Sequence, residues 1–107
     1  MITYEFHEKS GQKLNCCISG ELVCPISLSN LNAVFDTARS MECDTLSLDF
    51  SRLNMINSAG IGKLLMENQK LRQEGKTLEV TGCPESLYSI FNIVQANKYF
   101  SIQRKPA

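Results

Sequence analysis

The chain has 107 residues, of which 43% are hydrophobic and 21% charged, and its eleven basic residues balance eleven acidic ones. This length and composition predict one folded domain over residues 1–107, with a core of its own, and argue against a disordered chain. The scattered, balanced charge provides no basic patch for nucleic acid, and the sequence has no long uncharged apolar run that would cross a membrane.

The start of the chain lacks the pattern of a signal peptide, because polar residues interrupt it, and a cytoplasmic protein is expected. The five cysteines contain no C-x-x-C pair, which predicts small buried core residues rather than disulfides or a zinc site. His7 is the only histidine and lies in an alternating segment, so we expect neither a metal ion nor another cofactor.

The first half of the chain predicts two strands, a helix and a third strand. Apolar and polar residues alternate over residues 2–7 and 14–18, which is typical of a hairpin. Helical spacing then predicts a helix over about residues 28–41, with Ser27 as its cap. A short strand is predicted at residues 46–50, followed by a connecting segment at residues 51–54.

The stretch from residue 55 to 65 passes from an apolar segment through small residues into a second helix. We expect Ser58 to cap this helix with its side-chain oxygen, and Gly75 to end it. One face of the helix is predicted to be buried, with Ile61, Leu64, Leu65, Asn68 and Leu71. The other face, with Lys63, Glu67, Lys70 and Glu74, is predicted to be solvated.

The last part predicts a strand at residues 77–81, a turn at 82–84 and a third helix with Pro84 in its first position. Residues 96–98 are expected to end that helix, and residues 99–102 either pack on the sheet or extend it. The order is β-β-α-β-α-β-α, which predicts an α/β domain with a mixed sheet of about four strands and right-handed parallel crossovers.

Loops that leave the carboxyl ends of parallel strands gather at one edge of such a sheet, where ligands and partners usually bind. We therefore expect the loops at residues 21–25, 51–58 and 82–84 to be neighbours, with Ser58 accessible among them. The start of a helix favours anions through its free N–H groups and its dipole, so a phosphate on Ser58 would fit there.

Three segments carry a resemblance to a known family: Ile18-Ser19-Gly20-Glu21-Leu22, the run from Leu46 through Ser58-Ala59-Gly60-Ile61-Gly62, and Leu78-Glu79-Val80-Thr81-Gly82. Residues 88–100 add a last helix and a closing segment. With these features the chain resembles the STAS domain, and among its members the small stand-alone anti-sigma factor antagonists.

The resemblance implies a partner switch without enzymatic activity. It makes Ser58 the residue phosphorylated by an anti-sigma factor that is a serine kinase, and a PP2C-type phosphatase would reverse the reaction. The unphosphorylated form would bind the kinase and free a sigma factor or another output protein. The residues implied in partner binding are Asn57, Ala59, Gly60, Gly62, Lys63 and Glu21. A monomer is expected when the partner is absent.

Asn57 departs from the family, which commonly has an aspartate before the serine. Asn and Asp favour the same turn geometry, so the exchange can be neutral. A changed kinase preference and a member that is no longer phosphorylated are the other interpretations of the sequence.

Other functions are weighed against this one. A serine hydrolase is disfavoured because Ile56 stands where the G-x-S-x-G motif needs glycine, and a dinucleotide site is disfavoured because Leu65 replaces the third glycine of its motif. Lys63 could contact a phosphate or could lie on a solvated helix face. The alternative function that stays open is a non-switching STAS subunit or scaffold of a transporter or sensory complex.

Overall fold

The protein is represented by a computed structural model that describes residues 2–7, 11–23 and 25–105, with the backbone alone for residues 25–27. In chain order its elements are β1 (Ile2–Phe6), β2 (Lys13–Leu22), α1 (Pro25–Ser40), β3 (Thr45–Ile56), α2 (Ser58–Gln73), β4 (Thr77–Cys83), α3 (Glu85–Ile93), a 3-10 turn η1 (Ala96–Lys98) and β5 (Ser101–Arg104).

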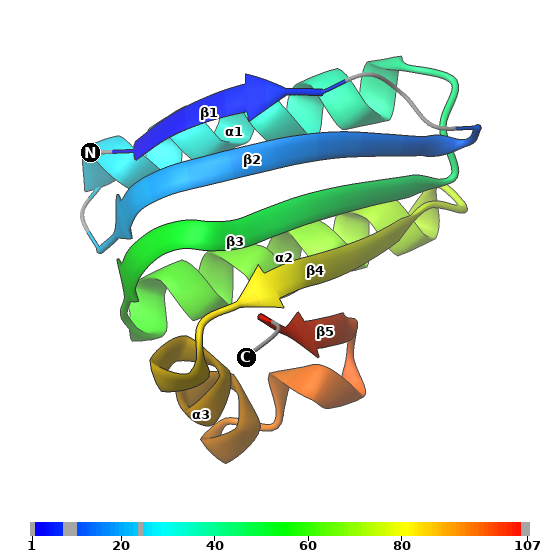
Figure 1. Cartoon of the computed structure of the whole chain (residues 1–107). Coiled ribbons are helices and arrows are strands. Elements are labelled where there is room, and N and C mark those ends of the chain that lie inside the picture. Colours follow the sequence, from blue (N-terminus) through cyan, green and yellow to red (C-terminus); the bar gives the residue numbers. More distant parts are fainter. Residues whose placement is uncertain (1, 8–10, 24, 106–107) are drawn as a thin grey trace.

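The strands form one mixed sheet in the order β1-β2-β3-β4-β5 (Figure 1). β1 pairs antiparallel with β2, which confirms the predicted hairpin, and the remaining pairs are parallel. Over the described residues the sheet has five strands, one more than the sequence predicts, because the closing segment adds β5 to the edge of β4. The predicted α/β fold is otherwise confirmed.

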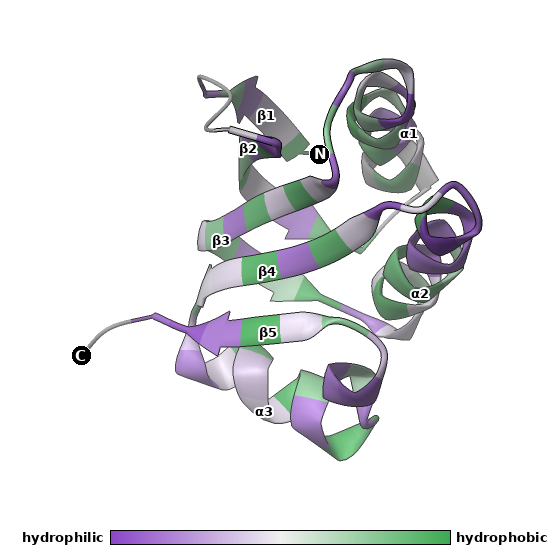
Figure 2. Ribbon diagram, turned by 90° about the vertical axis from the view of Figure 1, so that its right-hand side faces the viewer, coloured by the Kyte–Doolittle hydropathy of each residue, from purple (hydrophilic) through white to green (hydrophobic). Residues whose placement is uncertain are grey.

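The core lies between the sheet and its helices. α1 and α2 cover one face of the sheet, and α3 lies beyond its β5 edge (Figure 2). Phe91 of α3 stacks on Phe50 of β3 with their ring centroids 6.3 Å apart, which joins α3 to the same core. The opposite face is polar: Glu79 of β4 accepts hydrogen bonds from Lys13 of β2 at 3.1 Å and from Ser47 of β3 at 2.9 Å.

β3 is longer than the sequence predicts. Its pairing with β2 continues to Leu22 and Ile56 across two register shifts, so residues 51–54 belong to the strand and do not connect it to the helix. β4 pairs with β3 only from Thr45 to Asp49, so the last residues of β3 reach past β4. The carboxyl end of β3 therefore projects toward the start of α2 with β2 alone beside it.

The first and third helices also differ from their predicted bounds. α1 begins at Pro25, because proline suits the first turn of a helix, so Ser27 lies inside the helix rather than capping it. Pro84 stands just outside α3 as its cap residue rather than in its first position. α3 ends at Ile93, and residues 96–98 form the separate turn η1.

The end of α2 follows the prediction. Gly75 has a φ of +75°, its N–H donates to the Arg72 carbonyl, and the next amide, Lys76, donates to the Leu71 carbonyl at 2.8 Å. These two bonds satisfy carbonyls that the helix leaves without partners. The Lys76 ammonium in turn donates to three carbonyls at the end of α1, those of Ala38, Arg39 and Met41.

The described cysteines differ in their burial. Cys16, Cys43 and Cys83 are buried, as predicted, whereas Cys17 is half-buried on the polar face, and Cys24 lies outside the described residues. Burial raises the pKa of Cys16 to about 12 and that of Cys83 to about 11, so both thiols stay protonated near neutral pH.

In the described part of the chain, no helix is long and apolar enough to cross a bilayer.

Candidate functional site

The candidate site is the turn from β3 into α2. Phe50, Leu53 and Ile56 anchor the strand in the core, and the chain turns at Asn57, whose backbone is extended. Asn57, not Ser58, caps α2: its Oδ1 accepts a hydrogen bond from the Gly60 N–H at 3.0 Å. Both residue types suit a cap, but the extended backbone at Asn57 decides the position and makes Ser58 the first residue of the helix.

Asn57 makes a second side-chain bond that joins two elements. Its Nδ2 donates to the Val23 carbonyl at 3.0 Å, and its backbone N–H donates to the Leu22 carbonyl at 3.4 Å. An aspartate could cap the helix but could not donate to Val23. Asn57 therefore ties the end of β2 to the start of α2.

Ser58 and Ala59 are both exposed at the beginning of α2. Their amides occupy the first two helical positions, where an N–H group has no acceptor within the helix. The Ser58 hydroxyl thus lies at the positive end of the helix dipole, beside free N–H donors, where an attached phosphate is favourable.

The two glycines of the site have different surroundings. Gly60 is buried, and a Cβ there would lie 2.5 Å from the Leu22 carbonyl oxygen and 2.7 Å from Cγ1 of Ile56. Gly60 therefore allows α2 to start close against β2. Gly62 is exposed, and a Cβ there would meet nothing within 4 Å, so packing within the described part of the chain does not require a glycine.

Lys63 and Glu67 are not solvated as the sequence predicts. Glu67 is 2% exposed, and its carboxylate contacts Lys63 at 3.1 Å, Arg39 of α1 at 2.9 Å and Lys70 at 3.5 Å. Burial acts to raise the pKa of Glu67, but the hydrogen bonds and charges of these cations outweigh it and lower the pKa below its usual value. The ammonium of Lys63 therefore forms an ion pair with Glu67.

The predicted neighbours of the segment 51–58 are found at its two ends. Glu21 is exposed at the end of β2, paired in register with Met55, and the Asn57 bonds bring this end of β2 to Ser58. Gly82 lies beside the start of the segment, since a Cβ there would be 3.3 Å from Cβ of Ser51. Gly82 and Cys83 belong to β4, so the turn predicted at residues 82–84 is wrong for these two residues.

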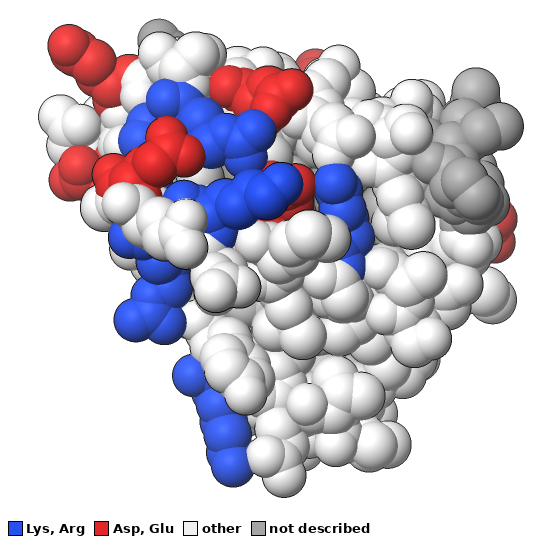
Figure 3. Space-filling view, turned by 180° about the vertical axis from the view of Figure 1, so that it is seen from behind, with Lys and Arg blue, Asp and Glu red and all other residues white. Residues whose placement is uncertain are grey.

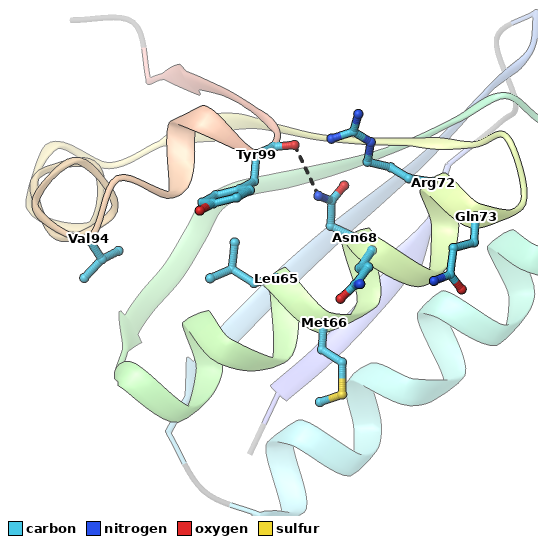
Figure 4. Close-up of a pocket in the computed structure, with 8 residues that line it drawn as sticks. Leu65, Met66, Asn68, Arg72, Gln73, Val94 and Tyr99 are labelled. Carbon is cyan, nitrogen blue, oxygen red and sulfur yellow. Dashed lines mark hydrogen bonds between the residues drawn. The ribbon is translucent and has the colours of Figure 1, made fainter.

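The sequence did not predict a groove between α2 and the segment around η1. Leu65 and Arg72 lie on its α2 side and Val94 and Tyr99 on the other (Figure 4). Its two walls are almost thirty residues apart in the chain, so no local pattern marks it; the signal available was Met66, an apolar residue outside the predicted buried face of α2. Among the described residues, no group of three His, Cys, Asp or Glu side chains could hold a metal ion.

The comparison with family models identifies the domain. The model described as Mlab, STAS domain matches residues 9–103, which is most of the chain. The chain belongs to the STAS family. No curated protein sequence matches it.

Solved STAS-like structures share the fold at low sequence identity. An anti-sigma factor antagonist from Mycobacterium paratuberculosis is 18% identical with a TM-score of 0.80, over 96% of this chain and 86% of that one. The unphosphorylated anti-sigma factor antagonist SpoIIAA is 15% identical with a TM-score of 0.70, over 98% and 90% of the two chains. The phosphorylated form of SpoIIAA, from Bacillus, is 16% identical with a TM-score of 0.69, over 94% and 90%.

The same fold also occurs in a different kind of protein. A sulfate transporter family protein from Wolinella succinogenes is 15% identical with a TM-score of 0.67, over 91% of this chain and 80% of that one. The STAS fold alone therefore does not separate a switching antagonist from a transporter module, and the functional argument rests on the residues of the site.

Proposed function

We propose that this STAS domain is an anti-sigma factor antagonist in a partner-switching system. The unphosphorylated domain binds an anti-sigma factor that is also a serine kinase, and this binding frees a sigma factor or another output protein. Phosphorylation of Ser58 ends the binding, and a PP2C-type phosphatase restores it. The domain itself acts by binding and not as an enzyme. The observation that carries the proposal is that Ser58 is exposed and is the first residue of α2.

Charge explains how one phosphate switches the contact. A phosphoserine adds about −1.5 to −2 charges and three acceptor oxygens at neutral pH. The start of α2 accommodates this charge, whereas a partner surface fitted to a neutral hydroxyl would have to bury it unpaired. If the poorer fit costs about 3 kcal/mol of binding free energy, the affinity falls about a hundredfold.

The partner surface that we propose runs from Glu21 across Ala59 to Gly62. Gly62 supports it because a glycine inside a helix costs about 0.5–1 kcal/mol relative to alanine. The described surroundings do not need this glycine, since a Cβ would meet open space, but a partner backbone approaching closely beside Ser58 would. Asn57 and Gly60 hold the start of α2 in place beneath this surface. Lys63 would contact the partner through its aliphatic chain, because its ammonium contacts Glu67.

A second candidate is a non-switching subunit or scaffold of a transporter or sensory complex. The likeness in fold to a sulfate transporter family protein favours it. Such a module would use the same face without modification of Ser58.

Phosphorylation of the purified domain tests the proposal directly. We expect the serine kinase encoded beside its gene, with ATP, to add one phosphate, and peptide mass spectrometry to locate it on Ser58. Phosphate elsewhere, or none with a kinase that is active on a control substrate, would exclude the switch and favour the non-switching module.

Calorimetric titration of the same kinase tests the consequence of the charge. We expect Ser58→Ala to bind as the unmodified protein does and Ser58→Asp to bind at least tenfold more weakly. Gly62→Ala should also weaken binding, because its methyl group enters the contact. Ser86→Asp is the matched control, since it adds the same charge to an exposed serine in the first turn of α3. Equal affinities for Ser58→Asp and Ser86→Asp would count against the proposal.

A further inference from the structure

A groove with exposed apolar groups lies between α2 and the segment around η1. It has a volume of about 760 Å³ and is lined by Leu65, Met66, Asn68, Arg72, Val94 and Tyr99, with two glutamines, and we name it the α2–η1 groove. Leu65 and Tyr99 face one another across it, with Val94 at one end and Arg72 at the other (Figure 4).

Three of the apolar side chains that line the groove are exposed to solvent. Met66 is 50% exposed, Val94 46% and Tyr99 56%. Exposed apolar residues are normally scattered singly over a protein surface. Where several gather in one hollow, they are typical of a binding surface. The groove thus offers an apolar side chain of a partner a place that the domain itself leaves unfilled.

The far wall of the groove is fixed in place. Gln95 adopts a left-handed conformation with a φ of 61°, which ends α3 and turns the chain into η1. Residues other than glycine are rarely found there, and such strain persists only where the surroundings hold it. The Asn68 Nδ2 donates to the Tyr99 carbonyl at 3.2 Å from within α2, so the two walls are tied together.

Positive charge continues the groove at its Arg72 end. A second hollow of about 490 Å³ adjoins it, shares Asn68, Arg72 and Tyr99 with it, and includes Lys98. Arg72 and Lys98 are exposed and take part in no ion pair within the described part of the chain, whereas Arg39, Lys63 and Lys70 all contact Glu67. In Figure 3 the lower part of this face shows only white and blue, with the acidic groups gathered above.

The α2–η1 groove is continuous with the surface around Ser58. Ser58, Gly62 and Met66 follow one another at a spacing of four residues along α2, so they lie on one side of the helix, and all three are exposed. From Ser58 to Gln69, which lines the groove, the helix rises about 17 Å. That span fits within one interface of ordinary size, which covers about 800 Å² on each partner.

We propose that the α2–η1 groove binds a segment of the protein partner that also contacts Ser58, and that this segment carries a large apolar side chain next to a carboxylate. The apolar side chain enters between Leu65, Val94 and Tyr99, and the carboxylate pairs with Arg72 and Lys98. The inference rests on the proposed function only in naming the partner that contacts Ser58; the chemistry of the segment follows from the groove itself.

Selection of peptides tests this chemistry without knowledge of the partner. A phage-displayed library of twelve-residue peptides is selected on the purified domain, and the peptides that dominate are synthesised and titrated into ¹⁵N-labelled protein. We expect the selected peptides to share an aromatic or leucine side chain with an Asp or Glu within four residues. Their binding should shift the amide signals of Leu65, Met66, Val94 and Tyr99.

Charge reversal in the groove provides the matched comparison. Arg72→Glu should weaken peptide binding at least tenfold and Tyr99→Ala at least fivefold. Arg52→Glu should change it less than twofold, because Arg52 is an exposed arginine of β3 in a separate hollow with Thr3 and Ser19. Replacement of the peptide carboxylate by its amide should reproduce the loss seen with Arg72→Glu.

Four outcomes would overturn the proposal: no selected peptide, peptides without a carboxylate, shifts confined to residues outside the groove, or equal binding to Arg72→Glu and Arg52→Glu. Sedimentation that shows a dimer broken by Tyr99→Ala would also overturn it, by making a second copy of the chain the occupant. The Ser58→Asp variant separates the two proposals. If it binds both the peptide and the kinase as tightly as wild type does, the proposed switch is refuted and the groove assignment stands.

Discussion

Asn57 uses both ends of its side-chain amide, which an aspartate at this position could not do. Its oxygen caps α2 through the Gly60 amide, and its nitrogen holds the Val23 carbonyl. The asparagine is therefore a structural link as well as a neutral neighbour for Ser58. Compared with an aspartate, it lacks a negative charge beside Ser58 and adds a bond that joins the end of β2 to the start of α2.

The two bonds of Asn57 can be separated by substitution. Asn57→Ala removes both and should lower the free energy of unfolding by about 1–2 kcal/mol, the usual effect of losing a helix cap. Asn57→Asp keeps the cap and loses the bond to Val23, so it should lower it by about 1 kcal/mol or less, partly offset by the helix dipole. Urea unfolding at pH 7 measures both. Equal destabilisation by the two variants would contradict the role of the cap, because only Asn57→Ala removes it.

At the scale of single residues, the sequence predicts that Ser58 lies at a helix start, and α2 begins there. The prediction was possible because small residues between an apolar strand and a periodic helix mark a helix start. The cap was assigned one residue too late, since Asn and Ser both suit it and only the backbone conformation decides. The burial of Gly60 depends on Leu22, which is distant in sequence, and could not be read locally.

At the scale of elements, α1 and α2 are joined by a cluster of charges around Glu67. Arg39 reaches from α1 to Glu67 and also contacts Asp36 and Glu74, while Lys63 and Lys70 approach Glu67 from its own helix. The periodicity of α2 placed Glu67 on a solvated face, because an amphipathic pattern cannot reveal a neighbouring helix that supplies an arginine. The cluster positions the helix that carries Ser58.

Removal of the Glu67 charge should destabilise the domain in a pH-dependent way. Glu67→Gln leaves three cations facing one another and should lower the free energy of unfolding at pH 7 by about 2 kcal/mol. The lowered pKa of Glu67 means that its contribution is complete above the ordinary carboxyl value of about 4.3 and is lost as the pH falls through the folded value. The difference between wild type and variant should therefore shrink as the pH falls below the ordinary carboxyl value.

Urea titrations at pH 7 and pH 3 measure this difference. Glu74→Gln is the control, because Glu74 is 45% exposed and contacts the same Arg39 at 3.8 Å, so its loss should change stability by less than about 0.5 kcal/mol. A difference between Glu67→Gln and wild type that does not shrink as the pH is lowered below the ordinary carboxyl value would contradict the role of the ionised carboxylate.

The elements themselves were predictable where periodicity was regular. The hairpin, the order of strands and helices, and the parallel crossovers follow from alternating and helical spacing. The length of β3 did not follow, because Arg52, Asn54 and Met55 are exposed and interrupt the apolar pattern while the strand still pairs with β2. β5 is an edge strand of four residues, too short to give a pattern of its own.

At the scale of the whole molecule, the sheet separates two surfaces. One carries α1, α2 and the α2–η1 groove, and the other is the polar face with Lys13, Ser47 and Glu79 (Figure 2). Both candidate binding features, the surface around Ser58 and the groove, belong to α2. A partner that covers this helix would therefore contact both together, and the phosphate that we propose on Ser58 would oppose a contact that the groove supports.

The fold should not change when Ser58 is charged, so the switch that we propose acts at the surface. Ser58 is exposed, Asn57 holds the helix start, and the dipole of α2 favours a negative charge at its first residue. Ser58→Asp should therefore unfold within about 0.5 kcal/mol of wild type, and its amide shifts should be confined to residues 21–23 and 56–62. Two-dimensional NMR with thermal unfolding measures this, with Ser86→Asp as the control. Shifts that reach Tyr99 or β5 would instead indicate a conformational switch, because those residues lie at the far wall of the groove, tied to α2 through Asn68.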